Sequence, residues 1–224
     1  VAAAPTMRAI VQDRYGSAET WELRDIERPD LKSNEVLLQV HAAGLDRGTW
    51  HEMTGRPYLM RITGFGLRSP KNRVPGRAVA GTVVAVGANI TRFTVGDDVF
   101  GVARGGFAEY AVARDDKLAH KPTTLTFEQA ATVPISATTA LQALRQGRIA
   151  AGQHILIIGA SGGVGTYAVQ LAKAFGAEVT AVCSASKADL VRSLGADHVI
   201  DYNSDDAVDG SRRYDLIVDI AGNT

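Results

Sequence analysis

A glycine-rich turn between an apolar run and a helical pattern constrains the fold of this chain more than any other stretch. The run His154 to Ile158 is short and rich in β-branched residues, which predicts a buried parallel strand. The turn Gly159 to Gly165 reads Gly-Ala-Ser-Gly-Gly-Val-Gly, and the helical pattern Val164 to Phe175 ends at a glycine. A second strand is expected over Glu178 to Val182. Strand, glycine turn, helix and strand within about 30 residues are typical of a dinucleotide-binding unit.

The turn has the small residues that a bound pyrophosphate requires. Gly162 and Gly163 allow the backbone to approach the phosphates, and Gly165 allows the helix to pack closely on the strand. Ala160 stands where the usual motif has its first glycine, so the match is not strict. The alternative is a glycine turn with a purely structural role. The predicted phosphate-binding residues are Ala160, Ser161, Gly162, Gly163, Val164 and Gly165.

The residues that follow the second strand favour NADP(H) over NAD(H). A site that prefers NAD usually has an acidic residue about 20 residues after the motif, which binds the ribose hydroxyls. Cys183 and Ser184 occupy these positions here, followed by Ser186 and Lys187, so no carboxylate would repel a 2′-phosphate. Ser184 and Lys187 are therefore predicted to bind that phosphate. The alternative is that this stretch only caps and solvates the next helix.

The composition indicates no nucleic-acid or membrane partner and excludes internal disulfides and zinc sites built from several cysteines. The 224 residues include 24 basic and 24 acidic side chains, so net charge indicates neither nucleic acid nor a membrane as a partner. The one cysteine excludes an internal disulfide and any zinc site built from several cysteines. No apolar run is long enough to span a membrane, and Val1 to Thr6 is too short for a signal peptide. We expect a soluble cytoplasmic protein.

The first half of the chain is predicted to be β-rich, without helices. Short alternating or β-branched stretches, separated by turn residues, predict a compact barrel-like domain over residues 1–125. The expected strands are Arg8 to Val11, Trp21 to Arg24, Val36 to Ala42, Gly81 to Gly87, Phe107 to Val112 and Lys117 to His120.

The pattern becomes α/β over residues 126–224. Thr126 and Gln129 predict a capping box at the start of a first helix, which Pro134 is expected to end. A second helix is expected over Ser136 to Gln146. Beyond the glycine unit, the pattern predicts a helix over Ser186 to Leu194 and strands over His198 to Asp201 and Asp215 to Ile220.

Four parallel strands predict part of a doubly wound sheet. The usual strand order, 3-2-1-4-5-6, would place the strand at Asp215 to Ile220 beside the strand at His154 to Ile158. The sequence stops at Thr224, so we expect an incomplete Rossmann domain with a bare strand edge and low turnover. That edge is expected either to self-associate or to be poorly ordered.

Several motifs occur in one order along nearly the whole chain after Met7. They are Glu35 to Leu38, Ala42 to Leu45, Gly76 to Gly87, Val95 to Gly101, Gly105 to Tyr110, Thr139 to Leu144, Gly159 to Gly165 and Leu194 to Tyr202. A β-rich domain followed by a dinucleotide fold with these motifs resembles the medium-chain dehydrogenase/reductase superfamily, in particular its zinc-free quinone oxidoreductase branch. The resemblance implies an α/β protein with a GroES-like N-terminal domain and a partial Rossmann domain.

The resemblance also implies an activity. Members of this branch transfer a hydride from NADPH to a quinone or an α,β-unsaturated carbonyl without zinc, mainly by orienting the reactants. A small-molecule substrate and a homo-oligomer are therefore expected. Two alternatives remain: a zinc-independent enzyme similar to alcohol dehydrogenases, and a protein that binds NADPH with little turnover.

The family pattern implies roles for further residues. The zinc-dependent relatives have a cysteine and a Gly-His-Glu where this chain has Asp46 and Gly76-Arg77-Ala78, so no metal is expected. His51 with Asp46 would offer only two ligands. Asp46 stands where the family usually has an asparagine near the nicotinamide. Thr139 matches a threonine that lies against that ring, and the alternative is that its hydroxyl only forms a hydrogen bond inside the start of a helix. Both are our predicted catalytic residues.

Three aromatic residues and one basic stretch complete the predictions. Tyr202 matches a tyrosine that holds the adenosine phosphate, whereas Trp50 and Tyr58 either form a wall around a planar substrate or belong to the core. The stretch from Arg56 to Arg77 has no acidic residue. It is either a solvated basic loop or one that steers an anionic substrate or cofactor. Its cations are Arg56, Arg61, Arg68, Lys71, Arg73 and Arg77.

Overall fold

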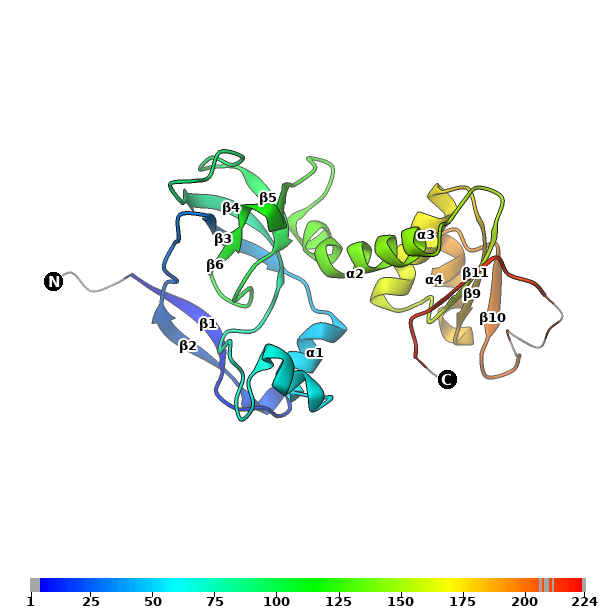
Figure 1. Cartoon of the computed structure of the whole chain (residues 1–224), viewed down its shortest axis with the longest axis horizontal. Coiled ribbons are helices and arrows are strands. Elements are labelled where there is room, and N and C mark those ends of the chain that lie inside the picture. The colour runs from blue at the N-terminus through cyan, green and yellow to red at the C-terminus, as the bar shows by residue number, and fades with distance from the viewer. Residues whose placement is uncertain (1–4, 206, 208–209, 211, 223–224) are drawn as a thin grey trace. The chain divides into compact units, whose positions relative to one another are not determined.

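The computed structural model describes residues 5–205, 207, 210 and 212–222, and the chain divides into two compact units, Val1–Ile135 and Ser136–Thr224 (Figure 1). The division falls inside helix α2 (Phe127–Gln146), whereas the expected domain boundary, between residues 125 and 126, lies just ahead of that helix. No helix in the described part of the chain is both long enough and apolar enough to cross a membrane.

The first unit consists mainly of antiparallel strands, as expected. The hairpin of β1 (Thr6–Gln12) and β2 (Trp21–Glu27) forms one sheet, and a five-stranded sheet has the order β6-β3-β4-β5-β7. Alternate residues of the central strands face a buried core that includes Val36, Leu38, Val79 and Val83. The strands of the larger sheet are β3 (Glu35–Ala43), β4 (Ala78–Val86), β5 (Asp98–Val102), β6 (Tyr110–Arg114) and β7 (Leu118–His120).

The prediction that this unit has no helix was wrong. Helix α1 (Arg47–Thr54) begins at Asp46, whose carboxylate accepts a hydrogen bond from the Thr49 N–H at 2.9 Å. It ends at Gly55, which has a left-handed φ of 61°. An aspartate cap and a glycine stop with eight residues between them were visible in the sequence, but the weak helix formers among those eight hid the pattern. Shorter helical turns lie at Ala18–Thr20, Arg61–Phe65 (a π-helical turn) and Asp115–Lys117.

Pro134 does not end a helix, contrary to prediction, and α2 continues through it. A proline inside a helix costs about 3 kcal/mol because it lacks the N–H donor and crowds the preceding turn. Burial offsets this cost on both sides: Ala130 and Ala131 lie in a core cluster of the first unit, and Ala140 and Leu144 lie in the core of the second. The predicted capping box is confirmed, because Thr126 and Gln129 exchange hydrogen bonds of 3.0 and 3.2 Å.

The second unit is a parallel sheet in the order β10-β9-β8-β11, which confirms the predicted order 3-2-1-4. One face packs against α2, α3 and α4, and the other includes Leu156, Val182 and Ile200 with Tyr214 beside them. Residues on both faces of β8 and β9 are buried, which explains why these two strands read as continuous apolar runs, whereas Ile217 of the edge strand β11 is 50% exposed. The elements are β8 (His154–Ile158), α3 (Gly163–Ala174), β9 (Glu178–Cys183), a 3-10 turn (Ala185–Lys187), α4 (Ala188–Ser193), β10 (His198–Asp201) and β11 (Leu216–Asp219).

Candidate dinucleotide-binding site

The glycine turn after β8 is held tightly against the neighbouring strand. The N–H groups of Gly159 and Ala160 both donate to the carbonyl oxygen of Val182 in β9, at 3.1 and 3.0 Å. The N–H of Gly162 donates back to the carbonyl oxygen of Gly159 at 3.1 Å. These bonds direct the chain from the end of β8 into the start of α3.

The glycine that makes the tight turn is Gly159, one position before the one expected. Gly159 has a φ of 82°, a region in which only glycine is free of strain. Ala160 is fully buried and is not among the residues with positive φ, so its methyl group is tolerated. The apparent departure from the usual motif at Ala160 therefore does not weaken the turn. The sequence did contain the signal for this turn, because Gly159 directly follows the apolar run His154 to Ile158. The predicted motif began one residue later, at Ala160.

Gly165 is required by close packing, as predicted. A Cβ atom at Gly165 would overlap the carbonyl oxygen of Gly159 and would lie 2.7 Å from Cα of Ala160. Gly162, the N-cap residue of α3, has no side chain to satisfy the first N–H groups of the helix. Those N–H groups, together with the helix dipole, form an anion-binding end that suits a pyrophosphate. The residues therefore fit a dinucleotide.

A cleft of about 820 Å³ opens beside this turn, at the carboxyl ends of the strands. Of the predicted cofactor-binding residues, Ser161 and Tyr202 line it. Adjacent parallel strands end at the same edge of a sheet, so the residues after β9 and β10 meet there. The other lining residues were not among the predicted cofactor-binding residues, and they are Ile158, Gly159, Val182, Cys183, Asn203, Ser204, Asp205, Ala207 and Ala221.

Asp205 matters most among the missed residues because it adds a carboxylate to the cleft. An acidic residue was expected after β9, whereas Asp205 follows β10. Its carboxylate accepts a hydrogen bond from the Ser204 hydroxyl at 3.1 Å. A second carboxylate, that of Asp201, is engaged by the N–H and the side-chain amide of Asn203 at 3.1 and 2.9 Å. An acidic residue at this edge is thus present, although not at the expected position.

The predicted 2′-phosphate ligands lie at the end of β9. The hydroxyls of Ser184 and Ser186 are 3.1 Å apart, and the carbonyl of Ser184 accepts the Lys187 N–H at 2.9 Å. Tyr202 is 62% exposed, and its N–H is bonded to the carbonyl of Cys183 at 3.4 Å. This bond ties the Tyr202 backbone to the residue just before Ser184. Burial, followed by the nearby Asp201 charge, raises the pKa of the Cys183 thiol, so Cys183 packs as a neutral group.

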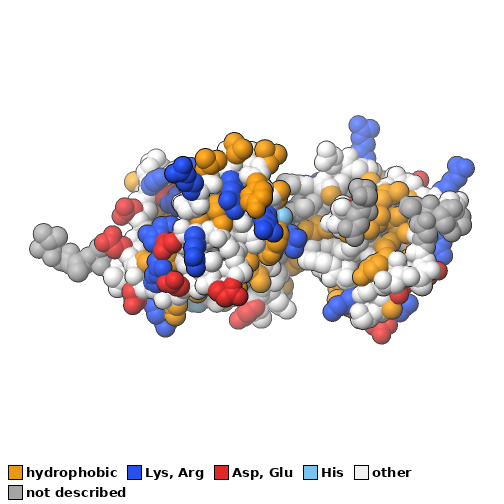
Figure 2. Space-filling model, turned by 90° about the horizontal axis from the view of Figure 1, so that it is seen from below, with side chains coloured by type: hydrophobic (Ala, Val, Ile, Leu, Met, Phe, Trp, Pro, Cys, Tyr) orange, Lys and Arg blue, Asp and Glu red, His pale blue; other side chains and the backbone are white. Residues whose placement is uncertain are grey.

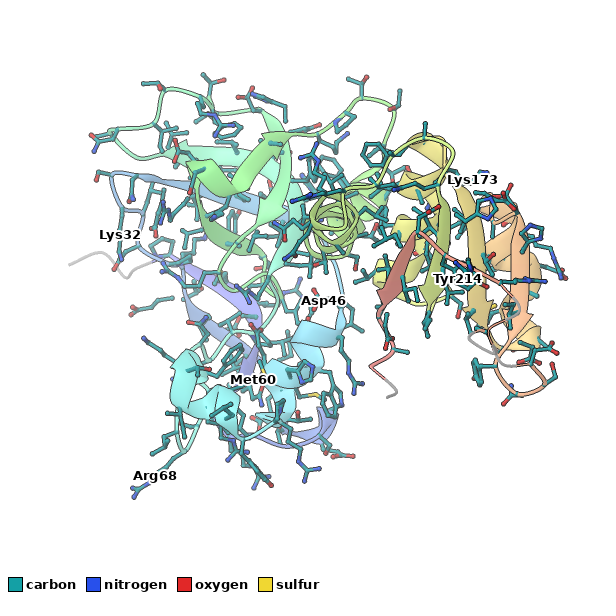
Figure 3. All side chains as sticks on the ribbon, turned by 45° about the vertical axis from the view of Figure 1, so that its right-hand side comes forward. Lys32, Asp46, Met60, Arg68, Lys173 and Tyr214 are labelled. Carbon is teal, nitrogen blue, oxygen red and sulfur yellow. The ribbon has the colours of Figure 1, made fainter. Side chains whose placement is uncertain are left out.

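The two predicted catalytic residues belong to different units. Asp46 lies at the start of α1 in the first unit, where its carboxylate caps the helix (Figure 3). Thr139 lies on the exposed side of α2 in the second unit. Capping is a structural role for Asp46 that the sequence analysis did not foresee. Joint action of these two residues on a substrate stays a prediction.

Glu52, on the same helix as the Asp46 cap, is an acidic group that sequence reasoning missed. Its side chain is 18% exposed, and its Oε1 atom lies 3.7 Å from Nε of Arg77. Burial raises the pKa of Glu52; Arg77 opposes that rise, and the charge of Asp46 adds to it. Glu52 and Arg77 both line a cavity of about 260 Å³ in the first unit.

The aromatic candidates have different surroundings. The Trp50 ring lies 4.1 Å from the Arg47 guanidinium carbon and contacts the His51 ring edge-on. Tyr58 is 63% exposed, so the alternative that it belongs to the core is wrong. His51 Nδ1 lies 2.6 Å from the carbonyl oxygen of Arg56. Within the described residues, no three His, Cys, Asp or Glu side chains are grouped to hold a metal, and metal independence stays a prediction.

Comparisons with known proteins agree with this arrangement. Residues 32–123 match the alcohol dehydrogenase GroES-like domain, and residues 163–224 match the zinc-binding dehydrogenase family. A chloroplastic quinone-oxidoreductase homolog of Spinacia oleracea is 40% identical over 96% of this chain and 68% of its own length. The NADPH-dependent alkenal/one oxidoreductase of Arabidopsis thaliana is 36% identical, over 96% of this chain and 58% of its own.

Solved structures give the same result. The quinone oxidoreductase from Coxiella burnetii superposes with a TM-score of 0.88 and 32% sequence identity, over 97% of this chain and 69% of that protein. The chain thus spans between 58% and 69% of the length of these three relatives.

Proposed function

The chain belongs to the medium-chain dehydrogenase/reductase superfamily, in its quinone oxidoreductase branch, and from this premise we propose that it transfers a hydride from NADPH to a quinone or an α,β-unsaturated carbonyl without zinc. The observation that carries the proposal is the turn from Gly159 to Gly165. Its backbone approaches too closely to admit a side chain at Gly165, and it presents the uncapped start of α3 beside a cleft. Such a site binds a dinucleotide phosphate.

Different residues of this chain bind the different phosphate groups of the cofactor. The α3 N-terminus and Ser161 hold the pyrophosphate, and Ser184, Lys187 and Tyr202 hold the adenosine 2′-phosphate. When bound, NADPH supplies the hydride. The substrate is a quinone or an α,β-unsaturated carbonyl compound, which the names of the Spinacia oleracea and Arabidopsis thaliana relatives support.

The preference for NADPH rests on the balance of two charged groups. Lys187 would attract a 2′-phosphate, whereas the carboxylate of Asp205, in the lining of the cleft, would repel it or bind a ribose hydroxyl instead. We propose that Lys187 dominates, because Ser184 and Tyr202 add hydrogen-bonding groups at the same edge. An Asp205→Asn variant is the informative control, since it removes the competing charge with little change of shape.

Two measurements test the function. Fluorescence titration with NADPH and NADH tests the cofactor site, and steady-state oxidation of NADPH with a panel of quinones and enones tests the reaction. We expect saturable NADPH binding, and turnover that is unaffected by a metal chelator. Binding without turnover on any acceptor would identify an NADPH-binding protein instead, and turnover of simple alcohols alone would identify an enzyme similar to the alcohol dehydrogenases. Absence of NADPH binding would refute the proposal.

A further inference from the structure

A short surface segment of the first unit exposes four large apolar side chains within ten residues. The segment runs from Arg56 to Lys71, and the apolar side chains are Tyr58, Leu59, Ile62 and Leu67, which are 63, 69, 72 and 66% exposed. Single exposed apolar residues are ordinary on a protein surface, whereas a contiguous group usually marks a place of interaction.

The exposure of these side chains is built into the fold of the segment. Arg61 points inward: its guanidinium donates to the carbonyl of Gly55 at 2.9 Å and lies over the Tyr15 ring at 4.3 Å. The Tyr15 hydroxyl, in turn, lies 2.8 and 2.7 Å from the carbonyl oxygens of Phe65 and Gly66. The segment is therefore fastened by polar contacts on its inner side, so its apolar side chains are held outward. This is the reverse of the usual pattern for a surface loop.

The segment is also positively charged, although the whole chain has no net charge. Arg56, Arg68 and Lys71 form no ion pair with any residue that the structure describes. In contrast, Arg73 and Arg77, which follow the segment, are paired with Asp13 and Glu52. Figure 3 shows Arg68 extending away from the body of the unit, and Figure 2 shows hydrophobic, basic and acidic side chains together on one face of the unit.

We propose that the Arg56–Lys71 segment binds the surface of a membrane that contains anionic lipids. Protruding aliphatic side chains, a tyrosine and unpaired cations fit the boundary between headgroups and acyl chains, where each finds its preferred surroundings. A protein partner would instead have to match both the apolar side chains and the unpaired cations of this segment in shape and in charge. The neutral overall charge of the chain predicted no membrane partner. However, the attraction of a cation to lipid phosphates decays within about 10 Å in salt solution, so the charge of the segment matters more than the charge of the whole chain.

Vesicle flotation tests the proposal with the unmodified chain. We expect it to float with vesicles of phosphatidylcholine mixed with phosphatidylglycerol, to bind vesicles of phosphatidylcholine alone much more weakly, and to dissociate as salt is raised. The double variant Arg68→Gln/Lys71→Gln should weaken binding to anionic vesicles by at least about tenfold, since each basic residue near such a surface contributes measurably. The double variant Leu59→Ser/Ile62→Ser should weaken binding to both kinds of vesicle.

Matched controls lie elsewhere on the surface. Leu23→Ser/Val95→Ser removes two apolar side chains that are 65 and 66% exposed, and Arg145→Gln/Arg148→Gln removes two exposed cations. Both controls should bind like the unchanged chain, and thermal unfolding of all variants should match. The proposal is overturned if the unchanged chain ignores anionic vesicles, or if segment variants and controls bind equally. It is also overturned if the unchanged chain forms a dimer that binds no vesicles, and the only effect of the segment variants is to dissociate that dimer.

Discussion

Replacing Gly165 by alanine tests most directly whether the glycine turn has the geometry described above. The added methyl group would overlap the carbonyl oxygen of Gly159 and would stand 2.7 Å from both Cα and the carbonyl carbon of Ala160. All three atoms belong to a backbone that two hydrogen bonds hold against Val182. No flexible side chain can move aside, so α3 must shift away from β8.

The expected magnitude combines two opposing terms. Alanine inside a helix is favoured over glycine by about 1 kcal/mol, which alone would stabilise the variant. Overpacking against fixed atoms typically costs about 1–3 kcal/mol, and the contacts here are with backbone in a buried position. Because every contact here is with fixed backbone, we take the upper end of that cost, and we expect Gly165→Ala to lower the free energy of unfolding of the second unit by up to about 2 kcal/mol net. It should also weaken NADPH binding, because the phosphate-binding end of α3 is displaced.

The variant Gly162→Ala provides the matched comparison within the same turn. Gly162 has an ordinary φ of −79°, and a Cβ atom there would lie 3.4 Å from its nearest neighbour, the Gly159 oxygen. Alanine at this N-cap should change the stability by less than about 1 kcal/mol. It should still weaken NADPH binding, because the methyl group stands where the phosphate approaches. The two variants thus separate the packing role of Gly165 from the binding role of Gly162.

The distribution of tryptophan makes the assay specific for each unit. Both tryptophans, Trp21 and Trp50, lie in the first unit, so their fluorescence reports its unfolding, whereas circular dichroism reports both units. In urea, Gly165→Ala should move the dichroism transition to lower denaturant and leave the tryptophan transition in place. If Gly165→Ala is as stable as the unchanged chain, or if Gly162→Ala is destabilised equally, the reasoning from close approach is refuted.

Four further predictions follow from single contacts. Lys187→Ala should weaken NADPH by about 1–2 kcal/mol and hardly affect NADH, and equal losses in fluorescence titrations would contradict the 2′-phosphate assignment. Burial alone would raise the pKa of Asp197, but bonds from Lys173 and from the Val179 N–H outweigh it and lower that pKa. The ionised Asp197 carboxylate therefore stabilises the folded state above the ordinary aspartate pKa of about 3.9, and this stabilisation is lost as the pH falls toward the lowered pKa. The free energy of unfolding should then decrease less between neutral and acidic pH in Asp197→Asn than in the unchanged chain. Thr126→Ala should cost about 1 kcal/mol in urea denaturation, because it removes one bond of the capping box. Elemental analysis of the purified chain should find no stoichiometric zinc, and stoichiometric zinc would show that the expected absence of a metal is wrong.

Local sequence signals were enough for the second unit. The apolar runs, the glycines that end helices and the turn at Gly159 to Gly165 predicted β8, α3, β9 and β10 within one or two residues. These elements are defined by near neighbours, because strand periodicity and glycine conformation act over a few residues. The order of the four strands followed from the handedness and connection rules for parallel sheets, which depend little on side chains.

Tertiary packing decided α2, and end caps decided α1, where intrinsic helix propensity gave the wrong prediction. Pro134 is a strong local stop, yet α2 passes through it because alanines and a leucine on either side are buried in two separate cores. Helix α1 contains poor helix formers, and its ends are set by the Asp46 cap and Gly55. In both cases the deciding free energy comes from contacts or caps that intrinsic helix propensity does not measure.

For the candidate site, the sequence alone determined that a phosphate-binding turn follows the first strand of a parallel sheet, since that chemistry needs glycine at particular positions. Only the tertiary structure showed that Asp205 joins Tyr202 in the same cleft. It alone showed that the basic segment presents its apolar side chains outward. The physical reason is the same throughout: spacing along the chain specifies backbone conformation, whereas neighbours across a sheet or around a loop are decided by packing between distant residues.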